Sequence, residues 1–178
     1  MSTAAFVHIF YDSWVVGTVR VVVHNLGPVN PGAQVSHNHW TISLLVGGNK
    51  HILDFWGPHF SVRLDMQPVG PQNGQLFISF HQYLVSQSAT RYFDFEINLG
   101  FRVTVRQVKV LLQARGRHRY SMTEHGGCQH WCWTIIHDFC EAGIIPSIAA
   151  EQLRLEMENN YSLTLPPIRH KIEQGHFY

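Results

Sequence analysis

Charge is scarce in this sequence. Only 14% of its 178 residues are Asp, Glu, Lys or Arg, whereas soluble domains average about 25%. The 13 basic and 12 acidic residues nearly cancel, which leaves a formal net charge of +1 at pH 7. Because a chain without a basic excess has no broad attraction for a phosphate backbone, we expect no nucleic-acid partner.

Long apolar runs and a disulfide framework are also missing. The sequence contains no stretch of 18 apolar residues, so no transmembrane segment is predicted. The N-terminus lacks the basic and apolar regions of a signal peptide. The three cysteines, Cys128, Cys132 and Cys140, are odd in number and fall within one short segment, which is a poor basis for disulfides. These absences together predict a reduced, cytoplasmic protein.

The remaining composition is typical of a packed globule. Hydrophobic residues make up 45% of the chain, and a chain of this length can bury about 70% of its unfolded surface. The length, and the lack of repeats or linkers, predict a single domain over residues 1–178. Histidine is abundant, with 13 copies, and each copy is a possible base or proton donor near neutral pH.

The first half of the sequence has the pattern of strands, and the second half has the pattern of helices. Strands are predicted over residues 15–24, 39–46, 51–56, 60–66, 76–80 and 92–98, with a turn-rich stretch at 25–32. Helices are predicted from 105 to about 115, with Thr104 as N-cap, and over 128–142 and 146–159. Strands followed by helices predict an α+β fold with an antiparallel sheet packed against helices.

Cys128 is the leading candidate for a nucleophile. It follows two glycines and opens a predicted helix, where free backbone N–H groups favour a thiolate and can stabilise an oxyanion. A cysteine nucleophile also needs a base. His39 is the best candidate, because the same face of its strand carries Thr41 and Ser43. The alternative is a core cysteine, since Cys128 lies on the apolar stripe of its helix.

A metal site is the weaker interpretation of this segment. Cys128 and Cys132 share a helix face, and His125, His130 and His137 lie nearby, so a zinc site is geometrically possible. The spacing matches no zinc-finger pattern, and a stripe of cysteines on a helix is more often core. We therefore predict neither a metal nor a cofactor, and we expect His130, on the opposite side of the helix from Cys128, to be structural.

Two short motifs resemble those of the lecithin retinol acyltransferase-like family. The segment His39-Trp40-Thr41-Ile42-Ser43-Leu44 resembles its His-Trp-x-Ile-Tyr-x strand, and Gly127-Cys128-Gln129-His130-Trp131 resembles its Asn-Cys-Glu-His-Phe motif. Tyr120 resembles the tyrosine strand that leads into the family's cysteine. The family belongs to the circularly permuted branch of the NlpC-type, papain-like superfamily, in which the histidine strand precedes the cysteine helix. The resemblance implies that fold and a catalytic pair of Cys128 and His39.

The resemblance leaves the third catalytic residue open. His51 follows His39 by 12 positions, which is a suitable spacing, whereas Val62-Arg63-Leu64 resembles the Val-His-Leu that carries the family's second histidine. Arg63 cannot accept a hydrogen bond, so either His51 or a residue near Arg63 would orient His39. Arg63 itself can hold a substrate carboxylate.

These residues predict a cysteine-dependent acyl-group enzyme, a hydrolase or acyltransferase acting on a small-molecule amide, ester or thioester. The predicted catalytic residues are Cys128, His39 and His51. The predicted substrate-binding residues are Arg63, Trp40, Trp131 and Tyr120. No oligomeric state is predicted.

Two other functions fit the same residues. Gly127 and Gln129 depart from the family motif, and with Arg63 they favour a natural-product biosynthetic enzyme, such as a cyclase or isomerase, that reuses the pocket without acyl-enzyme chemistry. The chain as a whole, including residues 61–66 and 175–178, also resembles a group of filamentous-fungal proteins, some of them encoded near natural-product pathways. The third possibility is a non-catalytic binding module.

Overall fold

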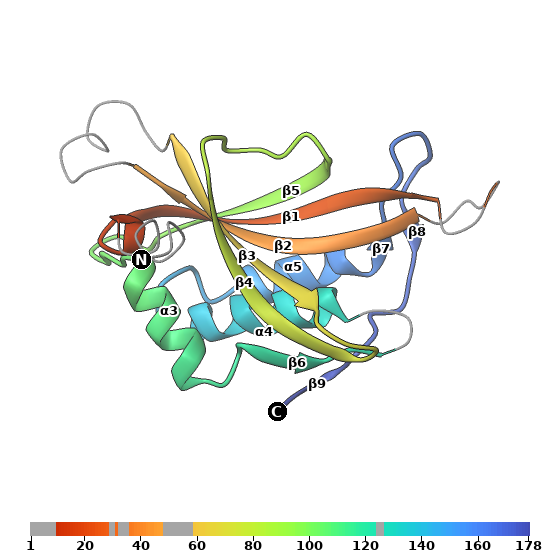
Figure 1. Ribbon diagram of the computed structural model, residues 1–178. Helices are drawn as coiled ribbons and strands as arrows, with labels where there is room; N and C mark the ends of the chain where they lie inside the picture. The colour runs from red at the N-terminus through yellow and green to blue at the C-terminus, as the bar shows by residue number, and fades with distance from the viewer. Residues whose placement is uncertain (1–9, 29–30, 32–35, 48–58, 124–126) are drawn as a thin grey trace.

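The computed structural model describes residues 10–28, 31, 36–47, 59–123 and 127–178. In these ranges the chain forms a large, twisted antiparallel sheet with helices packed on one face (Figure 1). The predicted α+β class, with an antiparallel sheet packed against helices, is therefore confirmed. The predicted strand at 51–56, which contains His51, lies outside the described residues.

Five strands make the body of the sheet. They are β1 (Val16–Pro28), β2 (Ser36–Val46), β3 (Phe60–Pro68), β4 (Asn73–His81) and β5 (Ala89–Glu96). Among the described residues the order is β5-β1-β2-β3-β4, continued at the β4 edge by the short strands β6 (Arg119–Ser121) and β9 (His176–Phe177). The turn predicted at 25–32 starts later than expected, because β1 continues to Pro28 through a register shift at which Gly27 takes a φ of 99°.

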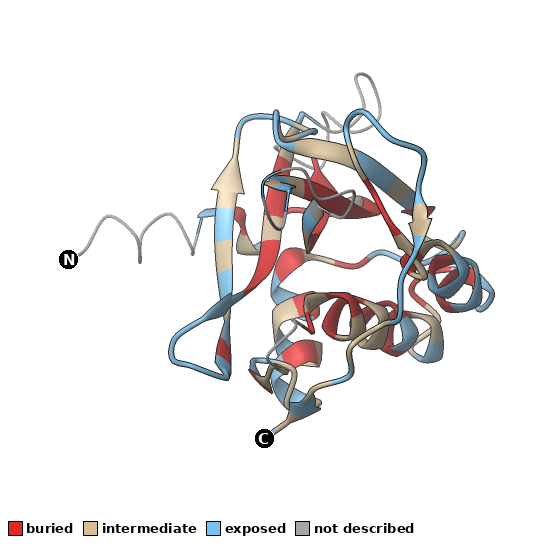
Figure 2. Ribbon diagram, turned by 90° about the vertical axis from the view of Figure 1, so that its right-hand side faces the viewer, coloured by how far each residue is buried: buried red, intermediate tan, exposed pale blue. Residues whose placement is uncertain are grey.

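The two faces of the sheet are buried in different ways. One face is apolar and forms the core with the helices, as Figure 2 shows by the gathering of buried residues between the layers. The other face buries polar side chains, which are satisfied by β5 and by the connection between β4 and β5. Arg20 Nε donates to Asp94 at 2.6 Å, Ser61 donates to the Tyr83 carbonyl at 2.6 Å, and His24 Nδ1 lies 2.8 Å from the Ser88 hydroxyl. This polar layer is possible because strand residues alternate between faces.

The helices cover the apolar face. They are α3 (Val105–Ala114), α4 (Cys128–Glu141) and α5 (Ala149–Met157). Thr104 caps α3 in a capping box with Gln107, which confirms the predicted N-cap. The helix predicted at 146–159 is shorter than expected. It begins at Ala149 and ends at Met157, and Asn159 belongs instead to β7 (Asn159–Asn160), which pairs with β8 (Ile168–Arg169). In the described ranges no helix combines the length and the hydrophobicity needed to cross a membrane.

Asp138 connects α4 to the turn that follows α3. Its side chain is 2% exposed and accepts hydrogen bonds from Arg115 Nη1 at 2.8 Å and from Arg117 Nε at 2.6 Å. Arg115 also bonds the half-exposed carboxylate of Glu141. Since a buried carboxylate is tolerated only when it is paired, Asp138 and its two arginines fix the position of α4 against the rest of the fold.

We expect Asp138→Asn to destabilise the fold. Removing one partner of a buried ion pair costs about 3 kcal/mol or more, so the free energy of unfolding in urea should fall by about that amount. Glu141→Gln is the matched control, because Glu141 bonds the same Arg115 from an exposed position and exposed pairs contribute about 1 kcal/mol or less. Equal losses in the two variants would contradict this role of Asp138.

Candidate functional site

The pairing of β2 with β3 ends before either strand does, and the candidate residues come together at this end of the ladder. The two strands are paired from Val46↔Phe60 to Ile42↔Leu64, and the ladder stops there although both strands continue. The first turn of α4 begins at this end of the sheet (Figure 1). His39 on β2, Asp65 on β3 and Cys128 at the start of α4 therefore converge from three elements.

The three side chains interact in series, with His39 coupled to both Asp65 and Cys128. His39 Nε2 lies 2.6 Å from Asp65 Oδ1, and Cys128 lies near enough to raise the pKa of the imidazole. The Cys128 thiol lies 4.0 Å from the carbonyl of Asn38. A carboxylate only accepts, so Nε2 carries the proton of that bond, and Nδ1 is the ring nitrogen that Asp65 does not engage. The order of the three groups is that of a nucleophile, a base and a residue that orients the base. We call Cys128, His39 and Asp65 the triad.

The electrostatics of the triad favour a charged imidazole. Burial lowers the pKa of His39, but the hydrogen bonds to Asp65 and to Cys128 outweigh burial and raise the pKa to about 9. Burial raises the pKa of Asp65, but its bonds to His39 and Gln67 and the charge of Arg63 hold that pKa below its usual range. At neutral pH an imidazolium therefore faces a carboxylate inside the site.

The second oxygen of Asp65 is held by its own strand. Oδ2 accepts from Arg63 Nη2 at 2.9 Å and from Gln67 Nε2 at 3.0 Å. Residues two apart on a strand share a face, so the alternation of β3 alone places these three side chains side by side. Both oxygens of Asp65 are thus occupied, which leaves the carboxylate one orientation toward His39.

The third residue of the site is Asp65, which the sequence motifs did not name. The sequence left that position to His51 or to a residue near Arg63, and Asp65, two residues beyond Arg63, occupies it. His51 lies outside the described residues. The available signal was the alternation Arg63, Asp65, Gln67 on a strand whose neighbour carries His39.

Three residues predicted to bind substrate lie in the core instead. Trp40, Trp131 and Tyr120 have no exposed surface. Trp40 follows His39 on β2, so strand alternation turns it to the apolar face. Trp131 Nε1 donates to the Arg117 carbonyl at 3.0 Å. A side chain without exposed surface makes no contact with a ligand, so the substrate-binding assignment of these three residues is corrected to packing.

Tyr120 shapes the start of α4. Gly127, the N-cap, takes a φ of 147°, and a Cβ at this position would lie 2.9 Å from the Tyr120 ring. The Tyr120 hydroxyl lies 2.9 Å from His130 Nδ1 and accepts the Gly175 N–H at 2.7 Å. Glycine is therefore required where the resembling motif has Asn, and His130 has the structural contact expected for it.

A zinc site that uses Cys128 and Cys132 gains no support from the environment of Cys132. Cys132 has no exposed surface, and burial raises its pKa well above the usual value. In the described part of the chain, the potential ligands close enough to share an ion are His137, Asp138 and Glu141. Asp138 is already committed to its two arginines, so this group is explained by ion pairing.

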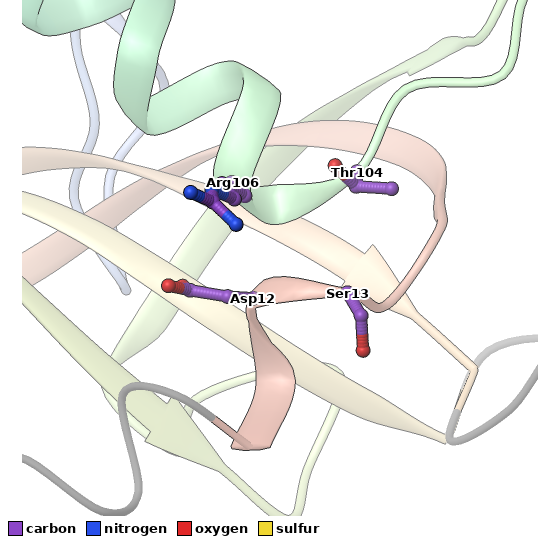
Figure 3. Close-up of a pocket in the computed structure, with 4 residues that line it drawn as sticks. All are labelled: Asp12, Ser13, Thr104 and Arg106. Carbon is purple, nitrogen blue, oxygen red and sulfur yellow. The ribbon is translucent and has the colours of Figure 1, made fainter.

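A cavity of about 550 Å³ lies at the junction of the N-terminal turn and α3. It is lined by Asp12, Ser13, Thr104 and Arg106 (Figure 3). Asp12 is bonded to Lys109 at 2.9 Å, and Thr104 is committed to the cap of α3. None of these lining residues belongs to the triad, and the polar groups of Asp12 and Thr104 already serve the fold.

We expect Asp65→Asn to lower the pKa of His39. Without the Asp65 charge, less remains to offset the lowering of the His39 pKa by burial. That pKa should therefore fall from about 9 toward or below its ordinary value of 6.5. Titration of the histidine ring resonances by NMR measures this change. Asp94→Asn is the control, because Asp94 bonds Arg20 on the same face of the sheet and should leave the His39 titration unchanged. A His39 pKa that stays near 9 in Asp65→Asn would contradict the pairing.

Comparison with known proteins identifies a family. Residues 19–178 match the family described as a domain of unknown function, DUF7770. No curated protein and no solved structure matches the chain significantly. The match covers nearly the whole sequence and includes all three residues of the triad, so the chain belongs to the DUF7770 family.

Proposed function

We propose that the protein is a cysteine-dependent acyl-group enzyme in which Cys128 is the nucleophile, His39 the base and Asp65 the residue that orients the base. The observation that carries the proposal is the imidazole of His39, which is hydrogen-bonded to Asp65 at 2.6 Å and whose pKa is raised by both Asp65 and Cys128. A cysteine that serves only in packing needs no buried imidazole and carboxylate aligned with its thiol.

The reaction follows from the position of the proton. With the proton on His39, the Cys128 thiolate attacks the carbonyl carbon of an amide, ester or thioester, and the C–S bond forms as the carbonyl π electrons move to oxygen. When the tetrahedral intermediate collapses, its bond to the leaving group breaks and His39 donates the proton to that group. Water, an alcohol or an amine then gives a proton to His39, attacks the acyl-enzyme and releases Cys128.

The start of α4 can stabilise negative charge on the Cys128 sulfur and on the substrate oxygen. Gly127 provides no side-chain cap for the first turn, so the N–H groups of that turn are available to a negative charge at Cys128 or on the substrate oxygen. Gln129 donates to the Met157 carbonyl at 3.1 Å and so ties the turn to α5. The helix end therefore presents its partial positive charge from a fixed position.

The chain order supports a circularly permuted papain-like fold. His39 lies on β2, ahead of the cysteine helix α4 in the sequence, as in the permuted branch that the motifs resemble. The antiparallel sheet with α4 against its apolar face agrees with that arrangement. We therefore include the permuted papain-like relationship in the proposal.

The contacts of Arg63 favour acyl chemistry over the biosynthetic alternative. That alternative uses Arg63 as a clamp for a substrate anion. Arg63 Nη2 is bonded to Asp65 at 2.9 Å, and its Nε is a buried atom without a hydrogen-bond partner among the described residues. The guanidinium is thus engaged with the triad itself, which suits a residue that positions Asp65.

We expect iodoacetamide to modify Cys128 much faster than Cys132 or Cys140 at neutral pH. The imidazolium of His39 favours a thiolate beside it, whereas burial raises the pKa of Cys132 and of Cys140. Mass spectrometry of the labelled peptides follows all three cysteines in one sample, so Cys132 and Cys140 are internal controls. His39→Ala should slow the labelling of Cys128 at the same pH. A Cys128 as inert as the other two would overturn the nucleophile assignment and leave the binding module.

Two substitutions separate the acyl-group enzyme from the biosynthetic enzyme. With p-nitrophenyl acetate as substrate, Cys128→Ala should abolish nitrophenol release and the acetylated peptide seen by mass spectrometry. Arg63→Ala should lower kcat only in part and shift its pH profile, because Arg63 acts through Asp65. A biosynthetic pocket without acyl-enzyme chemistry predicts no acetylated Cys128 peptide in the unaltered protein and nitrophenol release that Cys128→Ala leaves unchanged.

A further inference from the structure

A depression of about 470 Å³ lies between the end of α5 and the segment that follows β7. It is lined by Arg154, Glu158, Arg169, His170, Lys171 and Ile172. Small-molecule sites span about 300 to 1,000 Å³, so the depression has room for a small organic ligand. Figure 1 shows β8 beside the end of α5, at the side of the molecule where α4 begins.

Positive charge exceeds negative charge in this depression. Arg154, Arg169 and Lys171 are cationic, and Glu158 is the one carboxylate among the lining residues. Glu158 lies 3.6 Å from Arg169 Nη1, and the Arg169 side chain is 88% exposed, so this pair is weak. In a chain whose net charge is +1, the depression concentrates cations that are suited to an anion with several oxygens.

The walls that carry these cations are fixed by other contacts. The His170 N–H donates to the Glu158 carbonyl at 2.7 Å, and β8 pairs with β7, which ties the strand of Arg169 to the end of α5. The Arg154 guanidinium lies over the Trp133 ring at 5.5 Å. The depression thus brings cations from α5 and from residues 169–171 to one opening, with Ile172 as an apolar contact.

We propose that this depression binds the phosphate group of a small, soluble organic ligand. The guanidinium groups and the ammonium group donate to phosphate oxygens, and the space beside Ile172 accepts part of the organic portion. This site is separate from the triad and needs no reactive thiol.

Two contacts link the chain segments around the depression to the segments that carry the triad. Gln129, next to Cys128, bonds the Met157 carbonyl, and Met157 directly precedes Glu158. Asn38, next to His39, donates to the Tyr161 carbonyl at 2.7 Å, one residue past β7. A phosphate held here can anchor an acyl donor whose carbonyl reaches Cys128, and this last step rests on the proposed function.

Coenzyme A and pantetheine are the probes for the phosphate site, because pantetheine has the same thiol arm but lacks the phosphates and the adenosine attached to them. Calorimetry on Cys128→Ser protein, under reducing conditions at pH 7 and low salt, should show saturable binding of coenzyme A and none of pantetheine. Arg169→Ala with Lys171→Ala should weaken coenzyme A binding at least tenfold. The control variant, Arg102→Ala with Arg106→Ala, removes two exposed arginines elsewhere. It should leave the affinity for coenzyme A unchanged.

Three outcomes would overturn the phosphate site: equal binding of the two probes, equal loss in the two double variants, or binding of phosphatidic acid vesicles without binding of coenzyme A. The last would assign the cations to a membrane surface. Coenzyme A binding is measured on protein that lacks the Cys128 thiol. A failure to bind coenzyme A would therefore not affect the alkylation result for Cys128. An inert Cys128 would likewise leave coenzyme A binding intact, so the two proposals fail separately.

Discussion

The hydrogen bond between His39 and Asp65 is made where β2 and β3 stop pairing, and the candidate site depends on it. Asp65 is buried, and a buried carboxylate is stable only when its oxygens are bonded. His39 takes one oxygen, while Arg63 and Gln67 take the other. The same contact holds the imidazole in place and keeps it charged, so one bond both stabilises Asp65 and prepares the base for Cys128.

The position of Cys128 depends on a part of the chain that is distant in sequence. Tyr120 on β6 packs against Gly127 at the start of α4, and β9 covers Tyr120 from the C-terminal end of the chain. A Cβ at Gly175 would lie 2.8 Å from the Tyr120 ring, so the last strand is in close contact with that ring. The C-terminal residues therefore support the helix end that carries the candidate nucleophile, although they take no part in its chemistry.

Local patterns in the sequence predicted the elements well, but they predicted the site only in part. The start of α4 at Cys128 and the cap at Thr104 follow from residue types within one helical turn. Asp65 could not be assigned in the same way, because its role depends on where the β2–β3 ladder ends, and no local pattern encodes that register. Trp40 was assigned to a pocket by its residue type, whereas the alternation that placed His39 on one face already placed Trp40 on the other.

The three cysteines show that position along a helix decides whether a thiol is available for chemistry. Cys128 and Cys132 are one turn apart and share a face of α4. Cys132 packs fully inside the core, where burial raises its pKa. Cys128 stands at the helix end, partly exposed, where the sheet opens and His39 can reach it. An apolar stripe therefore does not mark every cysteine on it as core, because its first residue can lie beyond the layer that the stripe covers.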